Sequence, residues 1–248
     1  MNTARDLAIA ALDAAPDHGP AQGDLSLALA GAELLDLADA GALSLDGDDI
    51  VPGTTTSTGD PLLDEAAALV VRELPHESVE DWLWRRGREL AAAYTADLER
   101  AGLATRRGGR RLPVRSSRTT LVDSPERVRA HERLTSGDPV FTALAVSAGI
   151  LEDPNEDPNA GADEDTRSAE DPQGTKDAKD AKDAKDTDDS ADTDDSEDGG
   201  DTDHDGQITD DTVIAVLAGV GDAVMELEAV RQRRAIESAA FDNVWRGW

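Results

Sequence analysis

The chain of 248 residues contains no cysteine, which excludes disulfide bonds, thiolate catalysis and zinc sites built from cysteine. Long apolar runs are also missing, because the longest nearly uncharged stretch, residues 139–151, is too short to span a bilayer. Near the start of the chain, Asp6 and Asp13 interrupt the apolar segment that a signal peptide needs. We therefore expect a cytoplasmic protein.

Lysine is absent outside one strongly acidic segment, and this acidic, lysine-poor composition is typical of a prokaryotic source. Residues 152–211 carry 25 acidic and 5 basic residues, which give −20 of the chain's net charge of −30. The segment has almost no large apolar residue before Ile208, so apolar burial cannot offset its ordering entropy. We expect a disordered acidic insert at 152–211, and one domain formed by residues 1–151 and 212–248.

The remaining sequence predicts a mainly α fold, a single helical-bundle domain with small β-hairpins. Apolar residues recur at helical spacing in most segments, and Ser or Asp followed by proline marks three helix starts. Two hairpins are expected, at 42–51 and at 103–112, the second with its turn at Gly108–Gly109. The expected helices cover residues 3–15, 24–41, 60–70, 78–102, the stretches after 124 and after 138, and 213–227.

Arginines gather in one part of this acidic chain. Residues 85–118 hold ten arginines and three acidic residues, a net charge of +7. Guanidinium groups suit the oxygens of phosphates, so the cluster indicates a phosphate or anionic-lipid site. The alternative is that these arginines pair with acidic residues of the chain itself. The candidate site residues are Arg85, Arg86, Arg88, Arg106, Arg107, Arg110 and Arg111.

Motifs for metal binding or catalysis are weak. Asp201, Asp203 and Asp205 precede Gly206 in a pattern similar to a calcium loop, but Thr212 stands where a bidentate acid belongs. Such spacing arises easily in an aspartate-rich segment. The four histidines are scattered, and neither a nucleotide-binding glycine loop nor a nucleophile elbow is present. The sequence therefore predicts no enzyme, no cofactor and no firm metal site.

Four strings resemble the Golgi phosphoprotein 3 family, in its prokaryotic branch. The most specific is Thr58–Ala66 (TGDPLLDEA), and the others are residues 29–37, 41–45 and 98–103. The resemblance implies a mostly helical domain with a protruding hairpin that contributes to oligomers. It also implies a peripheral membrane protein that binds phosphatidylinositol 4-phosphate or acts as an adaptor for a protein client.

The resemblance also bears on the lipid headgroup pocket. Arg88 matches one of the family's pocket arginines, whereas Ala30 and Ala91 stand where two others would be. The loop before Asp24 lacks the pocket's tryptophan. The same resemblance implies that the 103–112 hairpin could join copies of the chain.

Two other functions fit parts of the pattern. A helix followed by a basic hairpin also looks like a winged-helix nucleic-acid binder, although the strong acidity of the chain disfavours a nucleic-acid partner. A structural protein that self-assembles through its hairpin is the other alternative. We expect a cytoplasmic protein located peripherally at the membrane, and contact with an anionic phospholipid headgroup.

Overall fold

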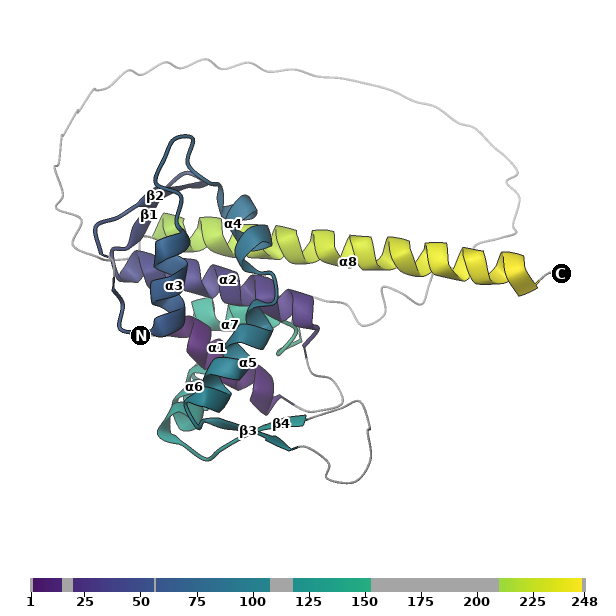
Figure 1. Cartoon of the computed structure of the whole chain (residues 1–248), viewed down its shortest axis with the longest axis horizontal. Coiled ribbons are helices and arrows are strands. Elements are labelled where there is room, and N and C mark those ends of the chain that lie inside the picture. Colours follow the sequence, from purple (N-terminus) through teal and green to yellow (C-terminus); the bar gives the residue numbers. More distant parts are fainter. Residues whose placement is uncertain (1, 15–19, 56, 108–117, 153–209, 247–248) are drawn as a thin grey trace, which may run out of the picture. The chain divides into compact units, whose positions relative to one another are not determined.

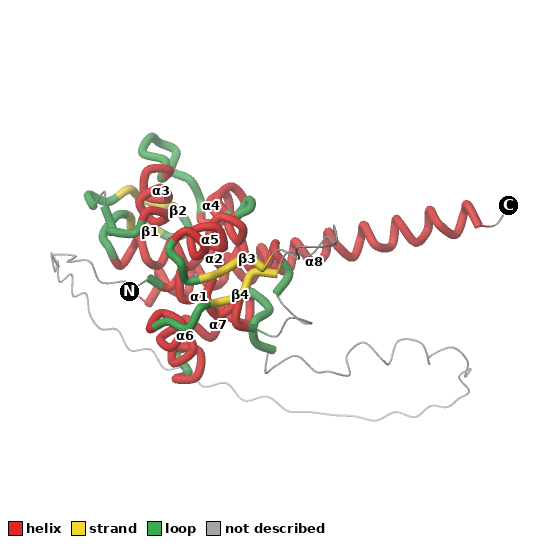
Figure 2. Tube along the Cα trace, turned by 60° about the horizontal axis from the view of Figure 1, so that its bottom comes forward, coloured by secondary structure: helices red, strands yellow, loops and turns green. Residues whose placement is uncertain are grey.

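The computed structural model describes residues 2–14, 20–55, 57–107, 118–152 and 210–246. It confirms a mostly helical fold with two small antiparallel strand pairs (Figures 1 and 2). The elements are α1 (Thr3–Asp13), α2 (Gln22–Asp39), β1 (Leu43–Asp46), β2 (Asp49–Pro52), α3 (Pro61–Leu69), α4 (Val79–Arg86), α5 (Leu90–Arg100), β3 (Ala104–Arg107), β4 (Arg118–Leu121), α6 (Pro125–Ser136), α7 (Pro139–Ser147) and α8 (Asp210–Arg246).

The central element is α2, which packs against α1, α4, α5, α7 and α8. Residues 26–37 are all buried, so this helix has no solvent-facing side over about three turns. Small residues allow that close packing, and a Cβ on Gly31 would collide with Val220 of α8. The predicted start at Asp24 is wrong by two residues, because α2 begins at Gln22 and Asp24 instead forms an ion pair with Arg231.

The predicted proline-marked helix starts are confirmed. Asp60, Ser124 and Asp138 each accept backbone N–H groups of the first turn, and proline occupies the first helical position each time. Ser78 caps α4 in the same way. These side chains satisfy N–H groups that a helix cannot pair internally, which is why short sequence motifs locate the starts so well.

The predicted single helix over residues 78–102 is wrong, because the structure divides it into α4 and α5. Gly87 ends α4, and a Cβ there would lie 2.6 Å from the carbonyl oxygen of Leu83. Glu89 then adopts a left-handed conformation with φ of 58°. The glycine inside the apolar pattern was the available indication of a break.

The first predicted hairpin is confirmed, with Leu43 opposite Pro52 and Asp46 opposite Asp49. The second is wrong in register, because Ala104 pairs with Leu121 and Arg107 with Arg118. Threonines and a leucine make residues 118–121 a better strand than 110–112, which Pro113 follows. The predicted turn and second strand lie outside the described residues.

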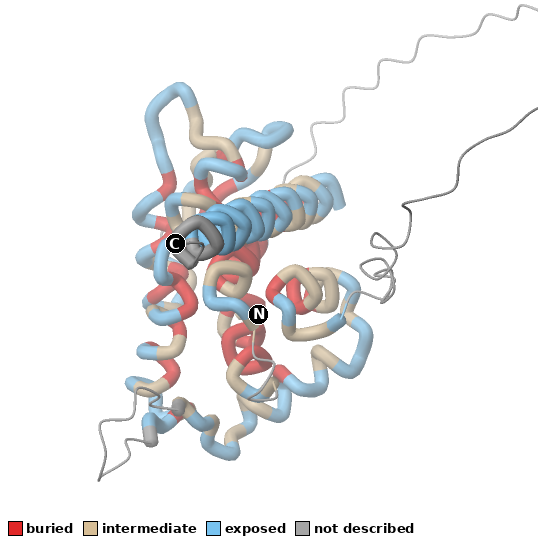
Figure 3. Tube along the Cα trace, turned by 90° about the vertical axis from the view of Figure 1, so that its right-hand side faces the viewer, coloured by how far each residue is buried: buried red, intermediate tan, exposed pale blue. Residues whose placement is uncertain are grey.

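Helix α8 packs against α2, α4 and α7. Its buried residues include Val216, Val220 and Ala223, and its C-terminal half extends beyond the other helices (Figures 1 and 2), where the tube is coloured as exposed in Figure 3. The predicted acidic insert lies outside the described residues except at its two ends. None of the helices in the described ranges combines the length and apolarity needed to cross a membrane.

Candidate functional site

The predicted arginine cluster is divided between the two ends of α5. Arg85, Arg86 and Arg88 lie at its N-terminal end, around the break after α4, while β3 follows its C-terminal end (Figure 1). With eleven residues, α5 separates the two groups by about 16 Å. The structure therefore presents two arginine groups and not one continuous band.

Arg86 points into the protein. Its Nε and Nη2 donate to the two carboxylate oxygens of Glu33 at 2.7 and 3.0 Å, and its Nη1 contacts Glu65 at 2.8 Å. The Tyr94 hydroxyl donates to Glu33 at 3.1 Å. The side chains of Arg86 and Glu33 are 8% and 0% exposed. The guanidinium of Arg86 is thus occupied by carboxylates of the chain.

Burial and ion pairing act in opposite directions on the pKa of each member of this interior pair. Burial raises the pKa of Glu33, and the hydrogen bonds and charge of Arg86 only partly oppose that rise. Burial alone would lower the pKa of Arg86, but Glu33 and Glu65 outweigh it and raise that pKa. Burial and the nearby Glu33 carboxylate also raise the pKa of Tyr94. Each member of the cluster therefore depends on the others to remain in the interior.

Arg85 is also paired, but at the surface. Its Nε and Nη2 each donate to Glu77 at 2.6 Å, and its guanidinium lies 5.1 Å from the ring centroid of Trp82. The side chain is 39% exposed. Arg85 therefore covers a buried aromatic ring and retains partial access to solvent.

Arg88 differs from both neighbours, because it forms no salt bridge within the part of the chain that the structure describes. It is exposed and lines a surface pocket of about 520 Å³. Glu89 and Ala92, at the N-terminal end of α5, also line this pocket. The other lining residues are Gln22, Gly23, Ser26, Leu27, Trp84, Gly87 and Leu227.

The sequence identified Arg88 but not Trp84, which lies four residues earlier on α4 and lines the same pocket. The spacing of four residues was the available indication. Ala30 and Ala91, which stand where the family pocket has arginines, are both buried at 0% and 4% exposure. The carbonyl of Ala30 accepts the indole N–H of Trp82 at 3.3 Å.

The hairpin arginines are described only in part. Arg106 is exposed and its Nε lies 3.3 Å from Glu99. Arg107 is a residue of β3, paired in register with Arg118, but the position of its side chain is not described. Arg110 and Arg111 fall outside the described residues, as do Asp201, Asp203 and Asp205. The predicted calcium loop therefore remains a prediction.

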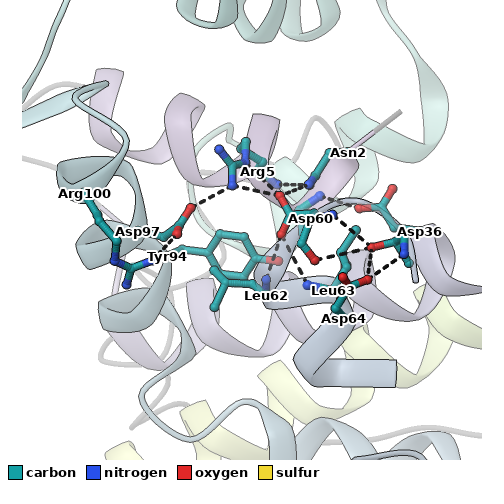
Figure 4. A network of polar contacts seen from close by, with 12 residues as sticks. Asn2, Arg5, Asp36, Asp60, Leu62, Leu63, Asp64, Tyr94, Asp97 and Arg100 are labelled. Atoms are coloured by element: carbon teal, nitrogen blue, oxygen red, sulfur yellow. Dashed lines mark hydrogen bonds and ion pairs between the residues drawn. The ribbon is translucent and has the colours of Figure 1, made fainter. Parts of the chain in front are cut away.

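A second polar site lies at the Thr58–Ala66 string and was not predicted (Figure 4). Asp60 caps α3 with one oxygen, and its other oxygen lies 2.8 Å from Arg5 and 2.7 Å from the Asn2 amide nitrogen. Arg5 also contacts Asp97 at 2.7 Å. Asp97 in turn binds Arg100 at 2.6 Å. These contacts join α1, α3 and α5.

Asp36 extends this network by capping α1 from a distant helix. Its two oxygens accept the N–H groups of Thr3 and Ala4 at 2.9 and 3.0 Å. Burial raises the pKa of Asp36 to about 6, and these hydrogen bonds only partly oppose that rise. No salt bridge of Asp36 is found among the described residues. It is thus an interior carboxylate held by backbone N–H groups and by the side chain of Thr3.

A pocket of about 730 Å³ opens beside this network. Its three arginines are all engaged: Arg5 with Asp60 and Asp97, Arg100 with Asp97, and Arg129 with Asp6. Its cations are therefore committed to carboxylates of the chain, unlike the cation of the Arg88 pocket. Across the described ranges, no group of three His, Cys, Asp or Glu side chains is placed to hold a metal ion.

Comparison with known proteins supports the resemblance found in the sequence strings. Residues 4–193 match the Golgi phosphoprotein 3 (GPP34) family, so the match includes every element from α1 to α7 apart from the first residue of α1. No curated protein matches the chain significantly. Because the family match covers well over half of the sequence, the chain belongs to the Golgi phosphoprotein 3 family.

Proposed function

We propose that the protein binds the phosphate-bearing headgroup of an anionic phospholipid, of the phosphoinositide type, through the Arg88 pocket. The observation that carries the proposal is that Arg88 lines a pocket while forming no salt bridge with the described residues. Family membership supports a lipid-binding or adaptor role in general terms. The protein would act in the cytoplasm as a peripheral membrane protein, and the proposal gives no residue a catalytic role.

The chemistry of the pocket suits a phosphate. A guanidinium can donate two parallel hydrogen bonds to phosphate oxygens, and these charge-assisted bonds are stronger than neutral ones. The N-terminus of α5 adds a partial positive charge, and no acidic residue occupies its first turn. Trp84 is half-buried at the same pocket, where an aromatic ring can contact the apolar part of a lipid.

Glu89 should limit the affinity of the pocket for anions. Its side chain is exposed and lines the pocket beside Arg88, so its carboxylate repels a phosphate. Removing that charge should strengthen binding, whereas removing the charge of Arg88 should weaken it. The two neighbours therefore give a matched pair of variants with opposite expected signs.

The hairpin arginines form the second part of the proposal. Arg106, Arg107, Arg110 and Arg111 would attract an anionic bilayer without recognising a particular headgroup, each contributing about 1 kcal/mol near the surface. Arg85 would add positive electrostatic potential beside the pocket. Arg86 would stabilise the interior behind the pocket through its pairing with Glu33. Salt should weaken the hairpin contribution strongly, because the Debye length is only about 10 Å at 0.1 M ionic strength.

Vesicle flotation tests this proposal. Full-length protein is mixed with neutral phosphatidylcholine vesicles, or with the same vesicles containing phosphatidylserine or phosphatidylinositol 4-phosphate. We expect retention on the anionic vesicles, an affinity about tenfold lower for Arg88→Ala, and a higher affinity for Glu89→Gln. Arg72→Ala is the matched control, since Arg72 is an exposed arginine outside the pocket.

The outcomes separate the alternatives. Equal losses for Arg88→Ala and Arg72→Ala would mean that only overall charge matters, and the pocket proposal would fail. If the protein binds no anionic vesicle but shifts duplex DNA in a parallel gel-shift assay, the result would favour the winged-helix nucleic-acid-binding hypothesis. A headgroup preference for the phosphoinositide over phosphatidylserine that disappears in Arg88→Ala would support the pocket as the recognition site.

A further inference from the structure

A second arginine lies beside the Arg88 pocket, on a different helix. Gly23 of α2 and Leu227 of α8 both line that pocket. A Cβ on Gly23 would lie 2.7 Å from Cδ2 of Leu227 and 2.9 Å from Nη2 of Arg231. The guanidinium of Arg231 therefore lies against a wall of the pocket, in space that any side chain at position 23 would need.

Only one nitrogen of this guanidinium is paired within the described ranges. Nη1 of Arg231 lies 2.8 Å from each carboxylate oxygen of Asp24 and 3.3 Å from Glu228. The N–H groups on Nε and Nη2 donate no hydrogen bond to a described residue, and the side chain is 34% exposed. Because a guanidinium donates from every one of its nitrogens, Arg231 keeps one edge available for a ligand.

Backbone N–H groups of α2 lie at the same wall. Gln22 and Gly23 are the first residues of α2, and both line the pocket. The N-cap, Ala21, has no side-chain oxygen to accept the first N–H groups, whereas Asp60 and Ser78 accept such groups at α3 and α4. The N–H groups of a first helical turn carry partial positive charge, which favours a nearby anion. An anion at this wall would therefore be stabilised by backbone donors as well as by a side chain.

Arg88 reaches the pocket from another part of the chain, the break between α4 and α5. Ser26 of α2 holds the start of α5 in place, because its hydroxyl accepts the N–H of Ala91 at 3.1 Å. Both residues of this contact are buried. The pocket is thus bounded by two cations on separate elements, Arg88 after α4 and Arg231 on α8.

Acidic residues around the pocket restrict the anions that it can hold. Asp24 and Glu228 share Nη1 of Arg231, and Glu89 lines the pocket without an ion pair among the described residues. A ligand with one anionic group would be attracted by one cation and repelled by the carboxylates near it. A ligand with two anionic groups would be attracted by both cations, which favours it over the first.

We propose that Arg231 and the first turn of α2 form a second anion-binding subsite of the Arg88 pocket. This inference rests on the proposed function and deepens it, because it assigns to the pocket a ligand with two phosphate groups, a phosphodiester and a phosphomonoester. Arg231 determines this specificity by binding one of the two phosphates. The family match at residues 4–193 does not include α8, so family membership alone does not assign the subsite.

Vesicle flotation at matched surface charge tests the subsite in the full-length protein. One set of vesicles contains phosphatidylinositol, whose headgroup has one phosphate, and the other contains phosphatidylinositol 4-phosphate, whose headgroup has two. Phosphatidylserine is added to the first set until the zeta potentials of the two sets agree. We expect the parent to bind the two-phosphate vesicles about tenfold more tightly, because only they engage both cations.

Arg231→Gln should remove this preference. We expect an affinity about tenfold lower for the two-phosphate vesicles, and a change of less than about threefold for the one-phosphate vesicles. Arg234→Gln is the matched control, since it removes the same charge from an exposed position of α8 that does not line the pocket. The control should keep the preference of the parent to within about threefold.

Two further variants separate ligand binding from the anchoring of α8, because Arg231→Gln also breaks the ion pair with Asp24. Arg231→Lys keeps the charge but lacks the planar fork, and it should lose most of the preference. Glu228→Gln keeps Arg231 and removes a competing carboxylate that is 50% exposed, so it should raise the affinity for the two-phosphate vesicles. Circular dichroism of each variant checks that the protein remains folded.

A soluble probe distinguishes a lipid from a free phosphorylated ligand. Glycerophosphoinositol 4-phosphate carries the same two phosphates without acyl chains, and titration calorimetry measures its affinity for the parent and for Arg231→Gln. Weaker binding of this probe than of the two-phosphate vesicles would assign the subsite to a lipid headgroup. Equal binding that Arg231→Gln weakens about tenfold would assign it to a soluble ligand.

The contrary outcomes separate this inference from the proposed function. Equal losses for Arg231→Gln and Arg234→Gln, or equal affinity of the parent for the two sets of vesicles, would overturn the subsite. If retention still depended on Arg88 in that case, the proposed function would stand without the subsite. If no anionic vesicle retained the parent, both would fail together.

Discussion

Arg86 and Arg88 are two residues apart in the sequence but occupy opposite electrostatic environments. Arg86 lies in the interior, where Glu33 takes up its guanidinium with two hydrogen bonds. Arg88 lies beyond the end of α4, lines a surface pocket and forms no salt bridge with any described residue. Both arginines belong to the same arginine-rich stretch of the sequence. The number of arginines nearby in the sequence therefore cannot distinguish a structural cation from one that is available to a ligand.

The difference arises from the helix break between them. Gly87 ends α4 and the left-handed Glu89 starts a new direction, so Arg86 still faces the interior of the bundle while Arg88 does not. A buried charge needs a protein partner to offset the loss of its hydration, whereas an exposed charge is hydrated by water. Stability should therefore depend on Arg86, and binding should depend on Arg88.

The largest effect should come from breaking the interior pair. Arg86→Ala leaves Glu33 buried without its cation, and we expect the free energy of unfolding to fall by about 3–5 kcal/mol. Urea denaturation measures the change, with Arg85→Ala as the surface control at less than about 1 kcal/mol. Replacing both Arg86 and Glu33 by methionine should recover most of the loss. Equal losses of unfolding free energy for Arg85→Ala and Arg86→Ala would show that the buried and the exposed arginine do not differ in their contribution to stability.

Asp36 offers a second interior charge, one without a cationic partner among the described residues. Its pKa rises from 3.8 to about 6 on folding, so the folded state holds the proton more tightly. Stability from this group is therefore present at low pH and is lost as the pH rises through about 4 to 6. The total loss is on the order of 3 kcal/mol.

Asp36→Asn should remove that dependence. The difference in unfolding free energy, variant minus parent, should rise between pH 4 and 6 and then level off. Urea denaturation at a series of pH values measures it, and subtraction cancels the titration of unaltered groups. A difference that stays flat would mean that folding leaves the pKa of Asp36 unchanged, because its hydrogen bonds fully offset its burial.

A smaller effect should follow from relaxing the backbone between the two arginines. Glu89 has φ of 58°, a conformation that glycine adopts without steric penalty. Glu89→Gly should raise the free energy of unfolding by up to about 1 kcal/mol, after allowing for the added freedom of the unfolded chain. Glu89→Gln, which keeps the steric penalty, should leave stability unchanged. Thermal unfolding of the two variants side by side makes the comparison.

The smallest effect on stability should come from Arg88 itself. Arg88→Ala should change the free energy of unfolding by less than about 0.5 kcal/mol, because the side chain is exposed. The measurement is the same urea titration used for Arg86→Ala. A loss of several kcal/mol would show that Arg88 supports the interior in the way that Arg86 does, and the contrast between them would collapse.

Local features of this fold were predictable from the sequence, whereas contacts between distant segments were not. The helix starts at Asp60, Ser124 and Asp138 follow from side chains that cap N–H groups two or three residues away. The first hairpin has a short turn that fixes its register. The second has its turn farther away, so strand propensity at residues 118–121 decided the pairing instead.

The prediction of the candidate site was limited in the same way, because contacts between distant segments could not be predicted. Arg88 could be found from its position in the arginine cluster and from the family strings. The partner of Arg86 could not, because Glu33 lies 53 residues away in the sequence and the two meet only when α2 and α4 pack. The contacts of Arg5 with Asp60 and Asp97 depend in the same way on the packing of α1, α3 and α5.

The complete burial of α2 has a consequence for how freely this sequence can vary. Because residues 26–37 touch other elements on every side, each substitution there alters a helix contact and none meets only solvent. Ala28, Ala30, Gly31 and Ala32 set the distances to the surrounding helices, so larger side chains would push whole helices apart. A library of random variants should therefore retain almost no changes at residues 26–37, while the neighbouring helices tolerate many on their outer faces.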